Sequence, residues 1–167
     1  FDSINIVNMN SEQIPPDLNA GVFRSLFEAI PGMYLVLTPD LTIYAASDEY
    51  LHATQRKREE VIGKYLFDAF PEHPDDLAAN WASNLHASLN YVLENKIGQT
   101  MAVKRYDTHR SDGSIEERYW RPVNKPVLSI ENEVIYIIHR VEDVTNLVSL
   151  QKAHAESEEE KNEFKSK

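Results

Sequence analysis

The spacing of apolar residues changes along the first part of the chain. Between residues 22 and 30, apolar side chains recur every three or four positions, which is typical of one face of a helix, and Pro31–Gly32 follows as a stop signal. Two short apolar runs, over about 33–37 and 42–46, flank the turn-forming sequence Thr38–Pro39–Asp40. These runs predict two strands joined as a hairpin.

Helical spacing returns in the middle of the chain. Ser47–Asp48 is a candidate N-cap, and the segment 57–62 followed by Gly63 predicts a short helix. The longest helical pattern covers about 76–96. Its apolar stripe is formed by Leu77, Trp81, Leu85, Leu89 and Val92. We expect Trp81 to be buried, because it lies within this stripe.

The second half of the chain is predicted to be mainly strand. A first run of strand-forming residues begins after Met101–Val103 and ends near Asp107. Two further runs cover about 117–127 and 134–141, and short turn sequences separate the three runs. Strands joined by tight turns pair as antiparallel neighbours. A polar, helix-forming segment follows from about Val144. An antiparallel sheet with helices packed on one face is an α+β domain, and this is the fold class that we predict.

Composition along the chain indicates three segments. Residues 1–20 are polar and contain the pair Pro15–Pro16, so they are predicted to be a lead-in or linker. Residues 21–146 hold the patterns described above and are predicted to be the folded domain. Residues 147–167 are predicted to be a helix or linker to a further domain. Because the chain opens at Phe1 rather than at a Met, we expect it to be part of a longer protein.

Charge and composition exclude several kinds of site. The chain has 167 residues, of which 42% are hydrophobic and 26% charged, as in a typical globular domain. A net charge of −10 argues against nucleic acid or a membrane surface as a partner. The absence of cysteine excludes disulfides, cysteine-ligated metal sites and thiol nucleophiles. No apolar run approaches the ~20 residues of a membrane-spanning helix.

Several short sequences occur in an informative order. They are Phe27–Gly32 (FEAIPG), Leu35–Asp40 (LVLTPD), Arg56–Gly63 (RKREEVIG), Arg110–Gly113 (RSDG) and Ile137–Thr145 (IIHRVEDVT). Together they resemble the PAS domain, a sensory module of bacterial signalling proteins, over roughly residues 22–146. The stretches YLVLTPDLTI, YWRPVN and YIIHRVEDVT are most similar to PAS sensors of two-component histidine kinases.

The resemblance implies both a fold and a function. The fold is a five-stranded antiparallel sheet with short helices on one face and a C-terminal exit helix. The function is a sensory or regulatory module without catalytic residues, in a cytoplasmic sensor histidine kinase that forms a homodimer. A small-molecule ligand or a partner would alter the last strands, and the exit helix would relay this to the output kinase domain as a population shift.

The cofactor is unknown from the sequence. The covalent flavin adduct and the thioester-linked chromophore of some PAS proteins both require a cysteine, so both are excluded here. Light-sensing flavin members carry a Gln where this chain has Val141, which forms no side-chain hydrogen bond. Haem-binding members often take an axial His from the long helix, where His86 is the one candidate; the alternative is a boundary residue with its polar edge in water. We expect a colourless domain without a metal.

His139, Val141 and Trp120 are candidate walls of a ligand cavity. Alternation along the last strand places Ile135, Ile137, His139 and Val141 on one face, and the resemblance implies that this face is inward. His139 could bind a ligand carboxylate or a metal there, or be a core histidine bonded to a backbone carbonyl. Trp120 could line the same cavity, or belong to the core or to a dimer interface.

The motif Asp143–Val144–Thr145 lies where the last strand gives way to the exit helix. The Asp143 carboxylate can cap that helix by accepting from a free backbone N–H in its first turn. In PAS domains this D-x-T motif is associated with coupling the core to the helix, so Asp143 and Thr145 are predicted signal-coupling residues. Val144, Leu147, Val148 and Leu150 are expected to form the packing seam of the helix.

Two other functions are kept as alternatives. The first is a ligand-free PAS domain that serves only as a dimerisation spacer, and a cavity lined solely by apolar groups would favour it. The second is a small α+β enzyme with a hydrophobic pocket. The sequence contains no phosphate-binding loop and no G-x-S-x-G motif that would support the enzyme.

Overall fold

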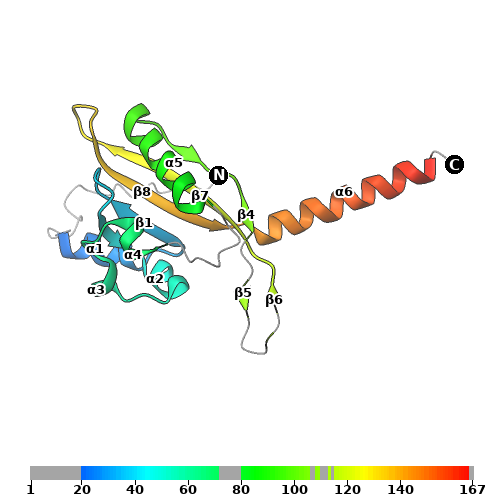
Figure 1. Ribbon diagram of the computed structural model, residues 1–167, viewed down its shortest axis with the longest axis horizontal. Coiled ribbons are helices and arrows are strands. Elements are labelled where there is room, and N and C mark those ends of the chain that lie inside the picture. Colours follow the sequence, from blue (N-terminus) through cyan, green and yellow to red (C-terminus); the bar gives the residue numbers. More distant parts are fainter. Residues whose placement is uncertain (1–19, 72–79, 106–107, 110–112, 114, 166–167) are drawn as a thin grey trace, which may run out of the picture.

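Figure 1 shows the computed structural model, which describes residues 20–71, 80–105, 108–109, 113 and 115–165. Its centre is an antiparallel sheet in the order β2-β1-β8-β7-β3, in which β4 also pairs with β7. The strands are β1 (Met33–Leu37), β2 (Ile43–Ala46), β3 (Gln99–Thr100), β4 (Lys104–Arg105), β7 (Tyr119–Leu128) and β8 (Val134–Asp143). The short strands β5 (Thr108–His109) and β6 (Ile115–Glu116) pair with each other. The predicted α+β class and antiparallel sheet are confirmed.

Short helices cover one face of the sheet (Figure 1). They are α2 (Asp48–Thr54), α3 (Arg58–Val61), α4 (Leu66–Ala69) and the longer α5 (Trp81–Asn95), whereas α1 (Ala20–Glu28) lies beside β2 and has no buried residue. The core lies between these helices and the sheet, and its fully buried side chains include Leu35, Leu37, Ile43, Leu66, Leu89, Val92 and Ile137. Ser47 caps α2, as predicted, and its hydroxyl also accepts from Tyr34 N–H at 2.9 Å, which ties the start of α2 to β1.

The predicted third strand is broken into β3 and β4, and residues 101–103 between them are not strand. β3 pairs with β7 through Thr100 and Val123, whereas β4 pairs through Lys104 and Trp120, so the register shifts in between. The break lies opposite Pro122, which has no N–H to donate to the ladder. The Pro122 carbonyl still accepts from Met101 N–H at 2.9 Å. Pro122 therefore keeps the hydrogen bond that its carbonyl accepts and lacks the one that a backbone N–H would donate.

Two details of burial differ from the prediction. Trp81 is only partly buried, because it is the first residue of α5 and packs at the margin of the core, where Lys104 Nζ lies 4.6 Å from its ring centroid. Ile135 is 43% exposed although it shares the alternation of buried Ile137. The pairing of β7 with β8 shifts by a bulge near Leu128 and Val134, so the inward alternation begins after Ile135. Leu77 lies outside the described residues.

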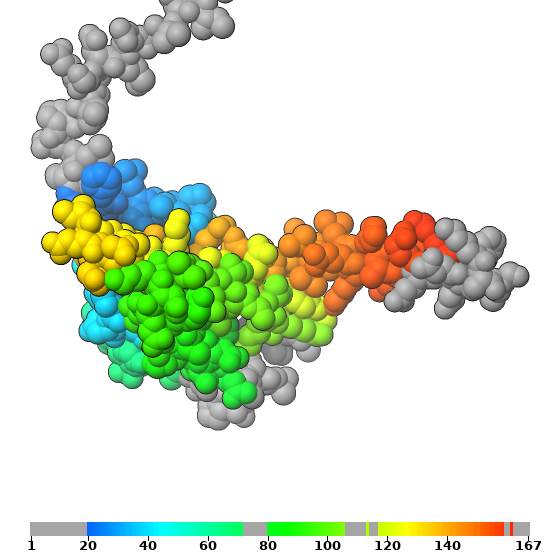
Figure 2. Space-filling model, turned by 90° about the horizontal axis from the view of Figure 1, so that it is seen from above, coloured from blue at the N-terminus to red at the C-terminus, as the bar shows by residue number. Residues whose placement is uncertain are grey.

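Helix α6 (Thr145–Lys165) leaves the end of β8 and extends away from the body of the domain, as Figures 1 and 2 show from two directions. Val144, the residue just before the helix, is buried. Leu147 and Leu150, which belong to the predicted packing seam, are 46% and 69% exposed. Among the described helices, none is both long enough and apolar enough to cross a membrane.

Candidate functional site

A buried polar cluster lies between α5 and the centre of the sheet. His139 and Asn124 are directly opposite each other on β8 and β7, and both are almost fully buried. His139 Nδ1 lies 2.7 Å from Asn124 Oδ1. Asn124 Nδ2 donates to Ser88 Oγ on α5 at 2.8 Å and lies 3.6 Å from Met101 Sδ. The prediction that His139 points into the core is confirmed, and its partner is a side-chain amide rather than a backbone carbonyl.

The cluster has a defined protonation pattern. Burial lowers the pKa of His139 to about 4, because the imidazolium would lose its hydration. The ring is therefore neutral at pH 7, and an Asn124 Oδ1 acceptor assigns its proton to Nδ1. The ring of Tyr50 packs edge-on against His139 with 6.2 Å between centroids. Burial also raises the pKa of Tyr50, so both aromatic polar groups stay uncharged in the core.

A second site, which we call the junction cleft, lies where β7 begins and β8 ends, beside the start of α6. It has a volume of about 440 Å³, and its lining includes Met33, Glu49, Trp120, Val141, Asp143 and Val144. Trp120 is opposite Asp143, and Val141 is opposite Met33 in the sheet. Three of the predicted site residues, Trp120, Val141 and Asp143, are thus brought together, while His139 lies apart in the buried cluster.

Charged groups around the junction cleft are held in ion pairs and hydrogen bonds. Glu142 contacts Arg121 at 2.8 Å and Arg140 at 2.7 Å. On the opposite wall, Glu49 Oε2 accepts from Gly32 N–H at 2.6 Å. The cleft therefore combines the apolar groups of Trp120 and Val141 with charged groups that are paired within the domain.

Asp143 and Thr145 form the junction between the sheet and α6. Asp143 Oδ1 accepts from Thr145 N–H at 3.0 Å and from Thr145 Oγ1 at 2.5 Å, which is the cap geometry that the sequence predicts. Asp143 Oδ2 lies 2.7 Å from Arg118 Nη1. Partial burial opposes ionisation of Asp143, but the hydrogen bonds from Thr145 and the Arg118 charge outweigh it and lower its pKa. Asp143 is therefore a carboxylate at neutral pH.

His86 belongs to neither site. It lies on the exposed side of α5, its ring centroid is 5.7 Å from that of Phe67, and its Nδ1 is 3.2 Å from Asn90 Nδ2. The apolar stripe of α5 is narrow, so the residue next to Leu85 already faces solvent. Of the two interpretations of His86, this geometry fits the boundary residue with its polar edge in water, and it does not support haem ligation. Among the residues that the structure describes, no cluster of three or more metal-ligating side chains occurs.

A groove of about 470 Å³ runs between α5 and the broken edge strand. Trp81, Ser88, Tyr91, Gln99, Met101 and Lys104 are among its lining residues. The side-chain oxygen of Gln99 is buried and finds no donor among the described residues. Ser88 and Met101 connect this groove to Asn124, so the buried cluster lies directly beneath it.

Sequence reasoning missed Asn124, Ser88 and Tyr119 as site residues. A signal for Asn124 was present, because an amide in the middle of a strand opposite an inward histidine needs a partner. Ser88 gave a weaker signal as a polar residue beside Leu89 in the apolar stripe of α5. Tyr119 gave none, since its importance comes from contacts with residues of α6 that are 25 or more positions away.

Comparison with known proteins identifies the family. A family model described as the PAS fold matches residues 27–149. The chain belongs to the PAS-fold family. The match runs from the end of α1 through the hairpin, α2 to α5 and strand β8 to the D-x-T junction, so the resemblance stated from the sequence is confirmed. A search of curated proteins gives no match.

Solved PAS structures share the fold at low sequence identity. The PAS domain of BvgS from Bordetella pertussis is 19% identical with a TM-score of 0.55, covering 83% of this chain and 96% of that one. A sensory box sensor histidine kinase from Vibrio cholerae is 15% identical with a TM-score of 0.51, covering 74% of this chain and 89% of that one. The VqmA–ligand–DNA complex from Vibrio cholerae is 23% identical with a TM-score of 0.54, covering 78% and 54%. These similarities establish the fold, and PAS domains with this fold are sensory modules.

Proposed function

We propose that this PAS domain senses a ligand or partner state at the junction cleft and relays it through α6 to an output domain of a longer protein. The observation that carries the proposal is that Asp143 and Val144 are part of the cleft wall and also lead into α6. An occupant of the cleft would contact the residues that determine where the helix begins. A change in population between two helix orientations is then sufficient to transmit the signal.

We propose a cytoplasmic sensor histidine kinase as the parent protein, acting as a homodimer with its own kinase domain as partner. The support is the resemblance of the sequence to PAS sensors of such kinases and a PAS-fold neighbour from a sensor histidine kinase. Residues 21–146 would be the sensory domain, residues 1–20 the preceding linker and residues 147–167 the signalling helix. In this proposal the chain itself has no catalytic role, and Asp143 and Thr145 are its coupling residues.

His139, Val141 and Trp120 have different roles in this proposal. Val141 and Trp120 line the junction cleft and would contact its ligand directly. His139 would act indirectly, by fixing the position of Val141 from the core. It is two residues before Val141 on the same face of β8 and is held by Asn124. His86 is dropped from the ligand-binding set because it is exposed.

The test is a pair of substitutions in the full-length parent protein. Asp143→Ala and Thr145→Ala should abolish signal-dependent output while the purified domain keeps its cooperative unfolding transition. The matched control is Glu158→Ala, which removes a carboxylate from an exposed part of α6 that pairs only within the helix among the described residues. Unchanged signal-dependent output in both junction variants would show that the junction is a passive tether, and the proposal would be wrong.

A ligand-free dimerisation spacer is the second candidate, because α1 carries apolar residues without cover. Phe23 is 59% exposed and Leu26 is 57% exposed. If Phe23→Asp converts the purified chain from dimer to monomer in sedimentation experiments and the parent's output then fails in the absence of any signal, the spacer explains the domain better than the sensor.

A further inference from the structure

Tyr119, the first residue of β7, is bonded to α6 and its lead-in residue through three different groups. Its backbone N–H donates to Thr145 Oγ1 at 3.0 Å, and its carbonyl accepts from Val144 N–H at 2.8 Å. Its phenol oxygen accepts from Lys152 Nζ at 2.6 Å. The first two bonds hold the beginning of the helix, and the third reaches a residue two turns further along.

Lys152 also brings Glu117, which lies between β6 and β7, into contact with the helix. Its ammonium lies 4.9 Å from the Tyr119 ring centroid and 3.4 Å from Glu117 Oε2. The Tyr119 hydroxyl donates to the same Glu117 oxygen at 3.0 Å, and the other Glu117 oxygen lies 2.5 Å from Arg105 Nη1 on β4. The contacts therefore run continuously from β4 through Glu117 and Tyr119 to α6.

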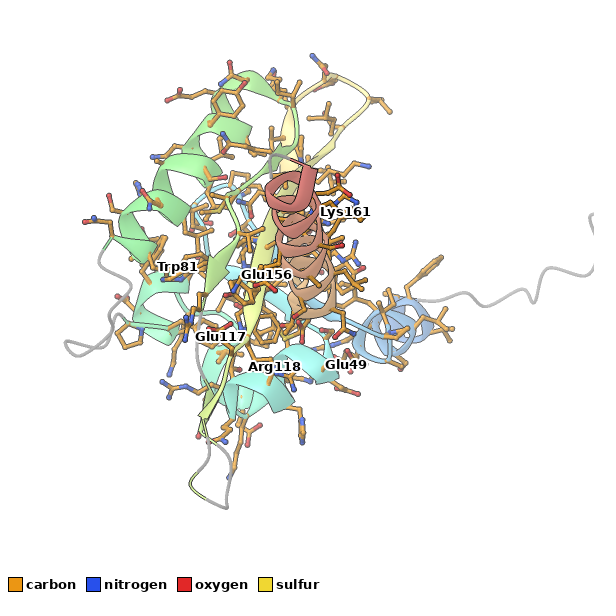
Figure 3. All side chains as sticks on the ribbon, turned by 90° about the vertical axis from the view of Figure 1, so that its right-hand side faces the viewer. Glu49, Trp81, Glu117, Arg118, Glu156 and Lys161 are labelled. Atoms are coloured by element: carbon orange, nitrogen blue, oxygen red, sulfur yellow. The ribbon has the colours of Figure 1, made fainter. Side chains whose placement is uncertain are left out.

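A helix bonded only at its first turn is free to swing, whereas a second contact two turns away fixes its direction. Among the residues whose side chains the structure describes, Lys152 is the last position of α6 that is bonded to the sheet; Lys161 pairs with Glu158 of the same helix. Figure 3 looks along α6 and shows Glu117 and Arg118, which lie just before β7, near the base of the helix.

We propose that Tyr119 and Lys152 are positioning residues that form a latch, and that closing or opening this latch sets the direction in which α6 leaves the domain. The proposal deepens the proposed function, because it names the contacts that a signal would have to change. Its statement about the direction of α6 holds or fails independently of what the output domain does.

The exposure of the latch is what makes it reversible. The side chains of Lys152 and Glu117 are 54% and 42% exposed, and ion pairs at such positions contribute little to folding. The latch can therefore open without unfolding the domain, while Val144 stays buried and keeps the start of the helix in place. Loss of such a contact is expected to change the ratio of docked to free helix about two- to five-fold.

The direction of α6 can be measured by pulsed electron paramagnetic resonance on the 167-residue chain. The chain has no cysteine, so E131C in the turn between β7 and β8 and E156C on α6 give one defined pair of spin labels. Both positions are exposed. Lys152→Met removes the ammonium but keeps the aliphatic stem, and Tyr119→Phe removes the hydroxyl but keeps the ring and both backbone bonds.

Both latch variants should broaden the label-to-label distance distribution and raise the free-helix fraction about two- to five-fold. Lys161→Met is the matched control, because it removes a lysine–glutamate pair of the same helix that does not reach the sheet, and it should leave the distribution unchanged. Sodium chloride at 1 M should broaden the distribution of the unmodified chain and have little further effect on Lys152→Met, since salt screens exposed charges.

An unchanged distribution in Lys152→Met, or an equal broadening in Lys161→Met, would overturn the latch. If a latch variant loses its cooperative unfolding transition, the salt titration of the unmodified chain decides the matter in its place. If the latch opens as expected but neither Asp143→Ala nor Lys152→Met changes the output of the parent protein, the relay is refuted and the latch is kept. Output that depends on Asp143 but not on Lys152 would refute the latch's role and keep the relay.

Discussion

The buried cluster and the α6 junction use similar chemical groups in opposite surroundings. In the cluster, His139, Asn124 and Ser88 are removed from water and each contact depends on the next. At the junction, Arg118, Asp143 and Lys152 are partly exposed and their contacts can exchange with water. Leaving a hydrogen-bonding group unpaired costs much more free energy in the buried cluster than at the partly exposed junction. The cluster is therefore suited to holding the fold, and the junction is suited to changing.

The largest expected effect comes from breaking the cluster. Asn124→Ala leaves the His139 N–H and the Ser88 hydroxyl without their partner in the core, so the free energy of unfolding should fall by about 3 kcal/mol. Urea denaturation measures this change. Gln151→Ala, which removes an exposed amide from α6, should change stability by less than about 0.5 kcal/mol. Equal effects of the two substitutions would remove the contrast between the two regions.

The next effect is the dependence of stability on pH. His139 has its pKa lowered from 6.5 to about 4 in the folded domain, so the unfolded chain binds more protons below pH 6.5. Stability from this group is unaffected above pH 6.5 and declines as the pH falls from 6.5 towards 4. Between pH 6.5 and 4.5 the loss from His139 is about 2 kcal/mol.

His139→Gln isolates that contribution, because a glutamine amide can still donate towards Asn124 but does not titrate. The variant should lose about 2 kcal/mol less than the unmodified chain over the same interval, as measured by urea titrations at several pH values. His154→Gln, at an exposed position on α6, should follow the unmodified chain. Parallel pH curves for the His139 variant and the unmodified chain would contradict a neutral buried imidazole.

A smaller effect is expected at the junction. Thr145→Val keeps the shape of the side chain but removes the oxygen that accepts from the part-buried Tyr119 N–H, which should lower the free energy of unfolding by about 1 kcal/mol. Thr145→Ser restores the hydroxyl and should recover most of that loss. Loss of stability in the valine variant as large as that of Asn124→Ala would show that the junction is as rigid as the cluster.

The smallest effect has the opposite sign. Gln99→Met keeps the length of the side chain and removes the buried oxygen that finds no donor among the described residues. Thermal unfolding should show a gain of about 0.5–1 kcal/mol, because an unsatisfied acceptor no longer has to be desolvated. A loss of stability instead would mean that the Gln99 amide makes a contact that the fold needs.

Local patterns were enough to predict most of the fold. The strands, the short helices, the cap at Ser47 and the inward side chain of His139 all depend on residues that are close in sequence. The residues whose burial was not predicted correctly are those whose exposure depends on neighbouring elements. Trp81 is partly exposed because it is the first residue of α5 and lies at the margin of the core, and His86 faces solvent because the sheet covers only a narrow stripe of α5.

The candidate site was predicted only in part for the same reason. Asp143 and Thr145 were found because a capped helix start is a local signal. Asn124 and Ser88 are 36 positions apart, and Tyr119 and Lys152 are 33 apart, so their contacts exist only once the sheet has paired and α6 has begun. A single sequence contains no local signal for such pairs.

The two prolines of β7 also affect how copies of the domain can meet. Pro122 and Pro126 leave the outer edge of the sheet beside β7 with only two short strands, β3 and β4, and a shift of register between them. A long flat edge would invite another molecule to extend the sheet by intermolecular strand pairing, and an interrupted edge resists it. The interrupted edge beside β7 is therefore a poor template for backbone pairing with a second copy of the chain.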